Sequence, residues 1–232
     1  MNLVERVWVL GCGLWASERG RPFVRFSPRT QNPQPTTLLA LIVLTVLIAA
    51  CAPVRVHENP VTLAAQSARE AELAPHDHWN LTARIAVSNG NDGGSGELEW
   101  RQDGAAYVFT VHAPVTGKTW KLSGDVQHAM LEGVDPQPLT GDDPERLLRE
   151  RLGWDVPLAD LTAWVRGMRA PGAAAQLQYD ARNLPAVLDQ AGWKVEYRDW
   201  FDDRSPALPR KVFASRGTAR VRVAIEQWSF DE

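Results

Sequence analysis

Two pairs of histidines are the first candidates for chemistry in this sequence. His76 and His78 have the spacing of two metal ligands, but no third ligand stands at a suitable distance from them. His112 and His128 could act as general bases, yet the sequence has no Gly-x-Ser-x-Gly turn of the kind that presents a nucleophilic serine. We therefore interpret all four as ordinary polar residues.

Carboxylate pairs and a lysine-containing turn are the remaining candidates. Asp142-Asp143 fits helix capping, and Asp202-Asp203 fits a solvated loop, better than either fits paired acid–base catalysis. Gly117-Lys118-Thr119 lacks the earlier glycine of a phosphate-binding loop. We expect a protein that is not an enzyme, that needs no cofactor or metal, and that hydrolyses no nucleotide.

The composition is that of a globular protein and gives no sign of a nucleic-acid partner. The chain has 232 residues, of which 44% are hydrophobic and 23% charged. Its formal net charge of -3 provides no basic stripe that could follow phosphates. Ten tryptophans are many for this length, and we expect most of them in the core.

An uncharged, apolar run of 13 residues at 38–50 predicts a signal peptide. A membrane-spanning helix needs about 20 such residues, so the run is too short to anchor the chain by itself. Arg21, Arg25 and Arg29 lie upstream of it, and their positive charges favour retention of this segment on the cytoplasmic side during export. We assign 1–50 to this peptide. The segment before the run is long for a signal peptide, so we expect the true translation start to lie downstream of Met1.

Ile48-Ala49-Ala50-Cys51 closes that run and resembles the lipobox of bacterial lipoproteins, in which cleavage precedes an acylated cysteine. Several acyl chains make such an anchor effectively permanent, because each buried methylene contributes about 0.8 kcal/mol. Cys12 would leave with the signal peptide, so no disulfide is expected. Ala52 is not the aspartate that retains lipoproteins in the inner membrane. This predicts a lipid anchor at Cys51 in the outer membrane, with the rest of the chain facing the periplasm.

The mature chain divides into a tether at 51–59 and a domain at 60–232. A helix is expected over 61–73, with Asn59 as its cap and Pro60 at its first position. Period-2 alternation between turn residues predicts strands over 79–87, 97–101, 107–111, 120–122, 130–131, 176–180, 193–200, 211–215 and 219–228. Two helices, 143–152 and 157–166, interrupt them.

These elements predict one mainly β domain with helices (α+β). A curved, partly open antiparallel sheet with helices against its concave side could enclose an apolar volume. Periodicity alone does not show such a volume.

An ordered set of short motifs covers nearly all of this domain. They are Trp79-x-Leu-x-Ala-Arg84-Ile-Ala-Val, Gly96-x-Leu-x-Trp100-x-Gln, Ala113-Pro114-Val115-x-Gly117, Leu152-Gly153-Trp154-x-Val-Pro157-Leu158, Leu161-x-x-Trp164-Val-Arg-Gly167, Gln190-Ala-Gly192-Trp193-x-Val-x-Tyr197, Leu208-Pro209 and Val223-x-Ile-x-x-Trp228. Each motif is weak alone, but together they resemble the LolB family of outer-membrane lipoprotein receptors. The resemblance implies a half-barrel of eleven strands, closed by helices around an apolar cavity for acyl chains.

The resemblance also implies a function and its partners. A protein of this family accepts acylated lipoproteins from a LolA-like periplasmic carrier and inserts them into the outer-membrane lipid, and we expect this chain to do so as a monomer. The family's membrane-contacting leucine lies in a Pro-Leu-Gly loop. Pro114, Val115 and Gly117 take that place here, with a smaller side chain and an additional Thr116. A lone valine in a turn can also be an ordinary surface residue.

Other assignments stay open. Candidates for the cavity lining are Leu98, Trp100, Phe109, Val111, Trp120, Trp164, Trp193 and Ile225, although ordinary core packing explains each of them as well. Carrier docking could use the late basic cluster of Arg204, Arg210, Lys211, Arg216, Arg220 and Arg222, which also fits solvated strand faces. A lipocalin-like lipoprotein that binds a small apolar ligand is the main alternative, and a scaffold lipoprotein is a more remote one.

Overall fold

The computed structural model describes residues 60–90 and 92–230. The expected signal peptide, Cys51 and the tether lie outside them. Among the described residues, no helix combines the length and the apolar character needed to cross a membrane.

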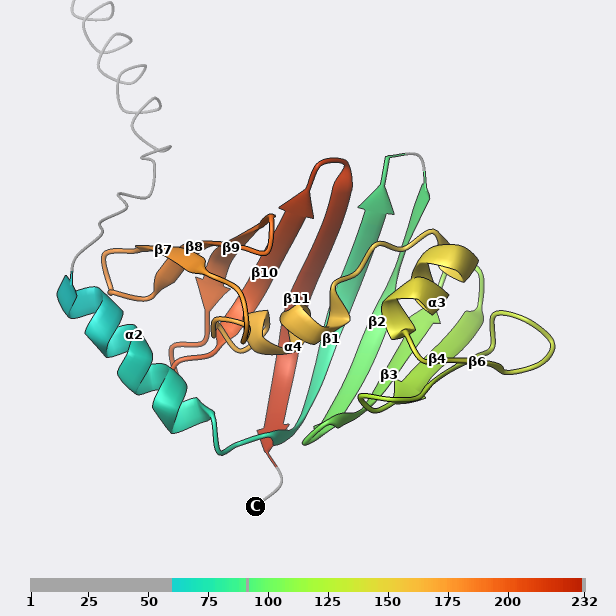
Figure 1. Cartoon of the computed structure of the whole chain (residues 1–232), viewed down its shortest axis with the longest axis horizontal. Helices are drawn as coiled ribbons and strands as arrows, with labels where there is room; N and C mark the ends of the chain where they lie inside the picture. The colour runs from blue at the N-terminus through green and yellow to red at the C-terminus, as the bar shows by residue number, and fades with distance from the viewer. Residues whose placement is uncertain (1–59, 91, 231–232) are drawn as a thin grey trace, which may run out of the picture. The chain divides into compact units, whose positions relative to one another are not determined.

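The described residues form one antiparallel sheet of eleven strands (Figure 1). The strands are β1 (His78–Asn89), β2 (Asp92–Asp103), β3 (Ala106–Ala113), β4 (Lys118–Gly124), β5 (Ala129–Glu132), β6 (Leu139–Gly141), β7 (Ala175–Tyr179), β8 (Pro185–Gln190), β9 (Trp193–Trp200), β10 (Pro209–Arg216) and β11 (Ala219–Phe230). Their spatial order is β6-β5-β4-β3-β2-β1-β11-β10-β9-β8-β7. Two meanders are therefore joined where the first strand pairs with the last, and β6 and β7 are free edges, so the sheet is open.

Three helices of the described region accompany the sheet, α2 (Pro60–Leu73), α3 (Pro144–Leu152) and α4 (Leu158–Trp164). Figure 1 shows α3 and α4 in front of the sheet and α2 beside the β7–β9 end. The local sequence sets the ends of α3. The Asp143 carboxylate accepts a hydrogen bond from the backbone N–H of Arg146 at 2.9 Å, and Gly153 ends the helix with a φ of 67°.

The core lies between one face of the sheet and these helices. All eight tryptophans of the described residues are buried. A continuous row of aromatic rings crosses β11, β1, β2, β3 and β4, with neighbouring centroids 5.2 to 6.0 Å apart. Its members in spatial order are Phe230, Trp228, Trp79, Trp100, Phe109, Trp120 and, from the loop after α3, Trp154. This row joins the two meanders into one core.

The expected architecture, an open antiparallel half-barrel with helices, is confirmed. Two short strands, β6 and β8, were not predicted individually. The helix expected over 157–166 ends at Trp164. Beyond it, the backbone N–H groups of Arg166 and Gly167 donate to the carbonyls of residues 163 and 164, three positions earlier, so the α-helical pattern stops.

Candidate functional site: an exposed turn and a pocket under the helices

The turn between β3 and β4 presents the most exposed large apolar side chain of the described residues. The backbone N–H groups of Thr116 and Gly117 both bond the carbonyl of Ala113, at 3.2 and 2.9 Å, and Gly117 has a φ of 66°. Val115 lies at the tip with 95% of its surface exposed. The turn is closed by its own hydrogen bonds, so exposure of Val115 does not depend on a loose loop.

Neighbouring strands hold the stem of this turn. The Nδ1 atom of His112 lies 2.8 Å from the Thr119 hydroxyl across the β3–β4 pair. On the other side β2 approaches closely, since a Cβ atom at Gly96 would lie 2.5 Å from the His112 carbonyl oxygen and 2.7 Å from Val111 Cγ1. The glycine therefore lets β3 lie against β2 at this point.

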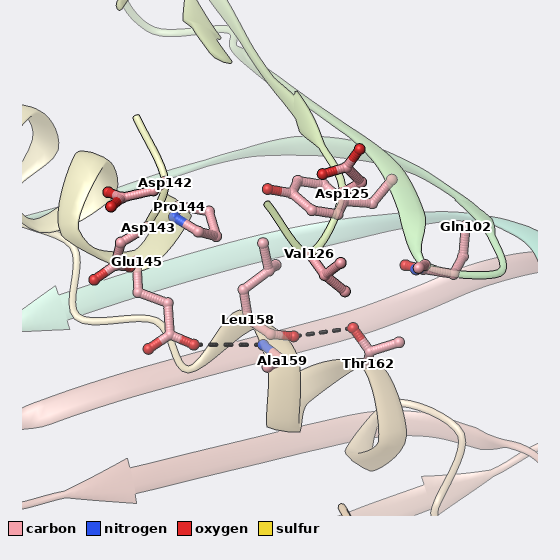
Figure 2. A pocket seen from close by; sticks show the side chains of 12 residues that line it. Gln102, Asp125, Val126, Asp142, Asp143, Pro144, Glu145, Leu158, Ala159 and Thr162 are labelled. Atoms are coloured by element: carbon pink, nitrogen blue, oxygen red, sulfur yellow. Dashed lines mark hydrogen bonds between the residues drawn. The ribbon is translucent and has the colours of Figure 1, made fainter. Parts of the chain in front are cut away.

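A pocket of about 440 Å³ opens between the sheet and the helices at the other end of β4 (Figure 2). Leu158, Val126 and Pro144 supply apolar lining. The first turn of α4 closes one wall, where the Glu145 carboxylate accepts a hydrogen bond from the Ala159 N–H at 3.4 Å. Such a volume lies in the range of roughly 300–1,000 Å³ typical of ligand sites.

Carboxylates surround the pocket. Asp125, Asp142, Asp143 and Glu145 all line it. Hydrogen bonds from the backbone N–H groups of Gln127 and His128 lower the pKa of Asp125, whereas burial, with help from Asp143 and Asp160, raises the pKa of Glu145. A rim with four carboxyl groups disfavours phosphate-bearing ligands and leaves the apolar lining as the feature a ligand could use.

The eight residues expected to line a cavity are all buried in the core. Trp100, Phe109 and Trp120 belong to the aromatic row, and the ring of Trp164, the last residue of α4, lies 6.2 Å from that of Trp193 on β9. Other residues line the pocket of Figure 2, so the role of these eight in acyl-chain binding stays a prediction.

Sequence reasoning missed the pocket of Figure 2. Its lining comes from the β2–β3 and β4–β5 turns, the start of α3 and the start of α4. Only the capping motif at Asp143 marked part of it in the sequence.

The other polar candidates have local structural roles. His78 Nδ1 lies 2.6 Å from the Asp103 carboxylate, and His76 packs against the Phe230 ring. No group of three or more His, Cys, Asp or Glu side chains in the described part of the chain could hold a metal ion.

The late basic cluster is partly neutralised by acidic residues. Arg216 lies 3.1 Å from the Asp155 carboxylate, and Arg210 and Lys211 lie 3.9 and 3.8 Å from Asp199.

Comparison with known proteins agrees with this geometry. The family model described as "Outer membrane lipoprotein LolB" matches residues 77–228. The outer-membrane lipoprotein LolB of Xanthomonas campestris is 39% identical over 170 residues, which cover 71% of this chain and 78% of the relative. The protein of the same name from Xylella fastidiosa is 38% identical over 177 residues, covering 73% and 81%.

Among solved structures, a LolA superfamily protein from Nitrosomonas europaea shares the fold. Its TM-score is 0.50 at 9% identity, with 74% of this chain and 94% of that chain covered. The sequence and family matches together extend over most of the β domain, and by them this chain belongs to the LolB family of outer-membrane lipoproteins.

Proposed function

We propose that this chain accepts acylated lipoproteins from a LolA-like periplasmic carrier and inserts them into the outer membrane as a monomer. The observation that carries the proposal is Val115, 95% exposed at the tip of a closed turn in a chain of this family. An apolar side chain held in water at this position can enter a lipid surface without any rearrangement of the turn. Pro114 and Gly117 shape the turn that presents it.

The anchor in this proposal is Cys51, acylated after removal of the signal peptide. It keeps the receptor in the outer membrane with its domain facing the periplasm. Because the anchor and the domain are joined by the tether at 51–59, the turn can reach only the membrane to which the protein is attached.

Transfer must run downhill in free energy. Exposing two acyl chains of a cargo lipoprotein to water would cost on the order of 20 kcal/mol at about 0.8 kcal/mol per methylene. The cargo therefore passes from the carrier to the receptor and then to the bilayer without leaving apolar surroundings, driven by increasing affinity and without nucleotide hydrolysis.

The pocket under α3 and α4 is the proposed entrance for acyl chains. Leu158 and Val126 provide apolar contact there, and the aromatic row lies deeper in the same half of the sheet. Deeper entry requires α4 to move, and the acyl chains must then replace the packing that its buried Leu158, Leu161 and Trp164 lose.

The test uses lipidated mature protein, a triacylated lipoprotein held by its carrier, and liposomes. We expect the cargo to move to the receptor and then to the liposomes. Val115→Glu should still accept cargo but fail to deliver it, because a carboxylate does not enter the acyl layer. The matched control is Val108→Glu, which changes a valine that is 36% exposed on β3, outside both the turn and the pocket, and should deliver normally.

The outcomes separate the proposal from its main alternative. Equal delivery by Val115→Glu and the unchanged protein would remove the turn from the mechanism. If no cargo moves while a small apolar dye binds tightly, the lipocalin-like function, which the apolar pocket also suits, replaces the receptor function.

A further inference from the structure

Helix α2 buries mainly polar residues and exposes mainly apolar ones. Its buried residues are Thr62, Gln66, Arg69 and Leu73, which share one helical face and include a single apolar side chain. Its exposed apolar residues, here called the outer face, are Val61, Leu63, Ala64, Ala65, Ala68 and Ala71. A surface helix ordinarily shows the reverse arrangement.

Hydrogen bonds rather than apolar packing hold α2 in this orientation. Arg69 Nη1 donates to the carbonyls of Arg166 and Ala207 at 3.1 and 2.9 Å, and Gln66 Nε2 donates to the Gly167 carbonyl at 3.0 Å. On the flank of the helix, Glu70 pairs with Arg169 at 2.5 Å. Because these contacts fix the inner side, the outer face cannot rotate inward without breaking them.

Exposed large apolar side chains are few in the described residues, and two of the five lie in the first turn of α2. Val61 is 72% and Leu63 47% exposed. Two exposed polar residues, Ser67 and Glu72, lie among the apolar residues of the outer face, so its first turn is its most apolar part. Contact of Val61 and Leu63 with water is therefore unfavourable.

The position of α2 in the chain points to the occupant. The helix begins directly after the tether at 51–59, and nine residues span at most about 30 Å when fully extended. With Cys51 acylated, as in the proposed function, the first turn of α2 is confined close to the bilayer. A mainly apolar helical face held there, with Val61 and Leu63 in its first turn, can lie in the plane of the membrane surface as an interfacial helix does.

We infer that the outer face of α2 rests on the phospholipid surface of the membrane that holds the lipid anchor. The inference depends on the proposed lipidation of Cys51 but not on Val115. Since the inner side of α2 is bonded to the domain, this contact orients the whole sheet relative to the bilayer. The domain is then held at the membrane in one orientation, which a flexible tether alone would not fix.

The experiment places a polarity-sensitive dye on lipidated mature protein in phosphatidylethanolamine–phosphatidylglycerol vesicles. Ala64→Cys introduces a thiol on the outer face, and after processing the chain has no other free thiol. Gln127→Cys, on the exposed β4–β5 turn, is the control position. We expect blue-shifted emission and quenching by brominated acyl chains for the dye at 64, and neither for the dye at 127. Val115→Glu should leave the signal at 64 unchanged.

Flotation with the vesicles separates the inference from the anchor on which it rests. If the protein floats but the dye at 64 stays in water, the inference is overturned while the lipid anchor stands. If the protein fails to float, the anchor and the inference fall together. A dye at 64 that responds only when the carrier is added would assign the outer face to a protein partner and also overturn the inference.

Discussion

Arg69 is the residue on which the position of α2 depends. Its guanidinium is buried, donates to the backbone carbonyls of Arg166, Gly167 and Ala207, and lies 5.2 Å from the centre of the Trp200 ring. Burial lowers its pKa to about 10, so it remains charged at physiological pH. Burial of this charge is compensated by the carbonyl acceptors and by the Trp200 ring that surround the guanidinium.

Arg69→Met should therefore destabilise the fold. The substitution keeps much of the volume but leaves buried carbonyl oxygens without donors, each of which costs about 1–3 kcal/mol. We expect the free energy of unfolding, measured by urea denaturation, to fall by about 2–4 kcal/mol. Arg84→Met is the control, because Arg84 is 75% exposed in its pair with Glu226 and such surface pairs contribute less than about 1 kcal/mol. Equal losses in the two variants would show that α2 is held by other contacts.

At the scale of elements, the close approach of β2 and β3 supports the turn that carries Val115. Gly96→Ala would place a Cβ atom 2.5 Å from a backbone oxygen, so one of the strands must shift. We expect a loss of about 1–3 kcal/mol in the free energy of unfolding. Ser95→Ala, at the exposed neighbouring position on the same strand, should change it by less than about 0.5 kcal/mol. A well-tolerated Gly96→Ala would mean that the β3 stem is free to move.

The strands also show which elements can be predicted from sequence patterns alone. Strands with one buried face, such as β1 and β9, alternate cleanly and were predicted nearly to their ends. β8 begins with a proline and buries residues of both faces, and β6 has only 3 residues, so neither carries a period-2 signal.

Helix α2 was predicted from its cap and its lack of breakers, but its orientation was not. Amphipathic patterning would have turned the alanines inward, whereas partners distant in the sequence, Arg166, Gly167 and Ala207, turn Arg69 inward instead. Within the candidate site, Val115 could be predicted from the family motif. The pocket of Figure 2 could not, because it exists only where distant turns and helix ends meet.

At the scale of the whole molecule, tyrosines report on both halves of the sheet. The chain has three: Tyr107 on β3 beside the pocket, Tyr179 on β7 and Tyr197 on β9. Each hydroxyl is buried and without a hydrogen-bond partner in the described residues. Burial raises the pKa of Tyr107 to about 12, with Asp125 and Asp143 adding to the effect, and also raises the pKa of Tyr179 and of Tyr197.

This arrangement predicts a steep loss of stability at alkaline pH. In the unfolded chain the tyrosines ionise near their ordinary value of 10.0, whereas in the folded protein they hold their protons above it. The folded state then binds more protons, so the stabilisation is complete below pH 10 and is lost as the pH rises through the folded-state values. Tyrosinate absorbance should be absent from the native protein near pH 10 and present in urea, and the urea midpoint should fall from pH 9 to 11. A tyrosine that titrates normally in the native protein would contradict the closed packing of its half of the sheet. Tyr107→Phe then identifies the open half. If the normal titration disappears in this variant, the opening lies at the pocket under α3 and α4. If it persists, the opening lies in the half bordered by α2.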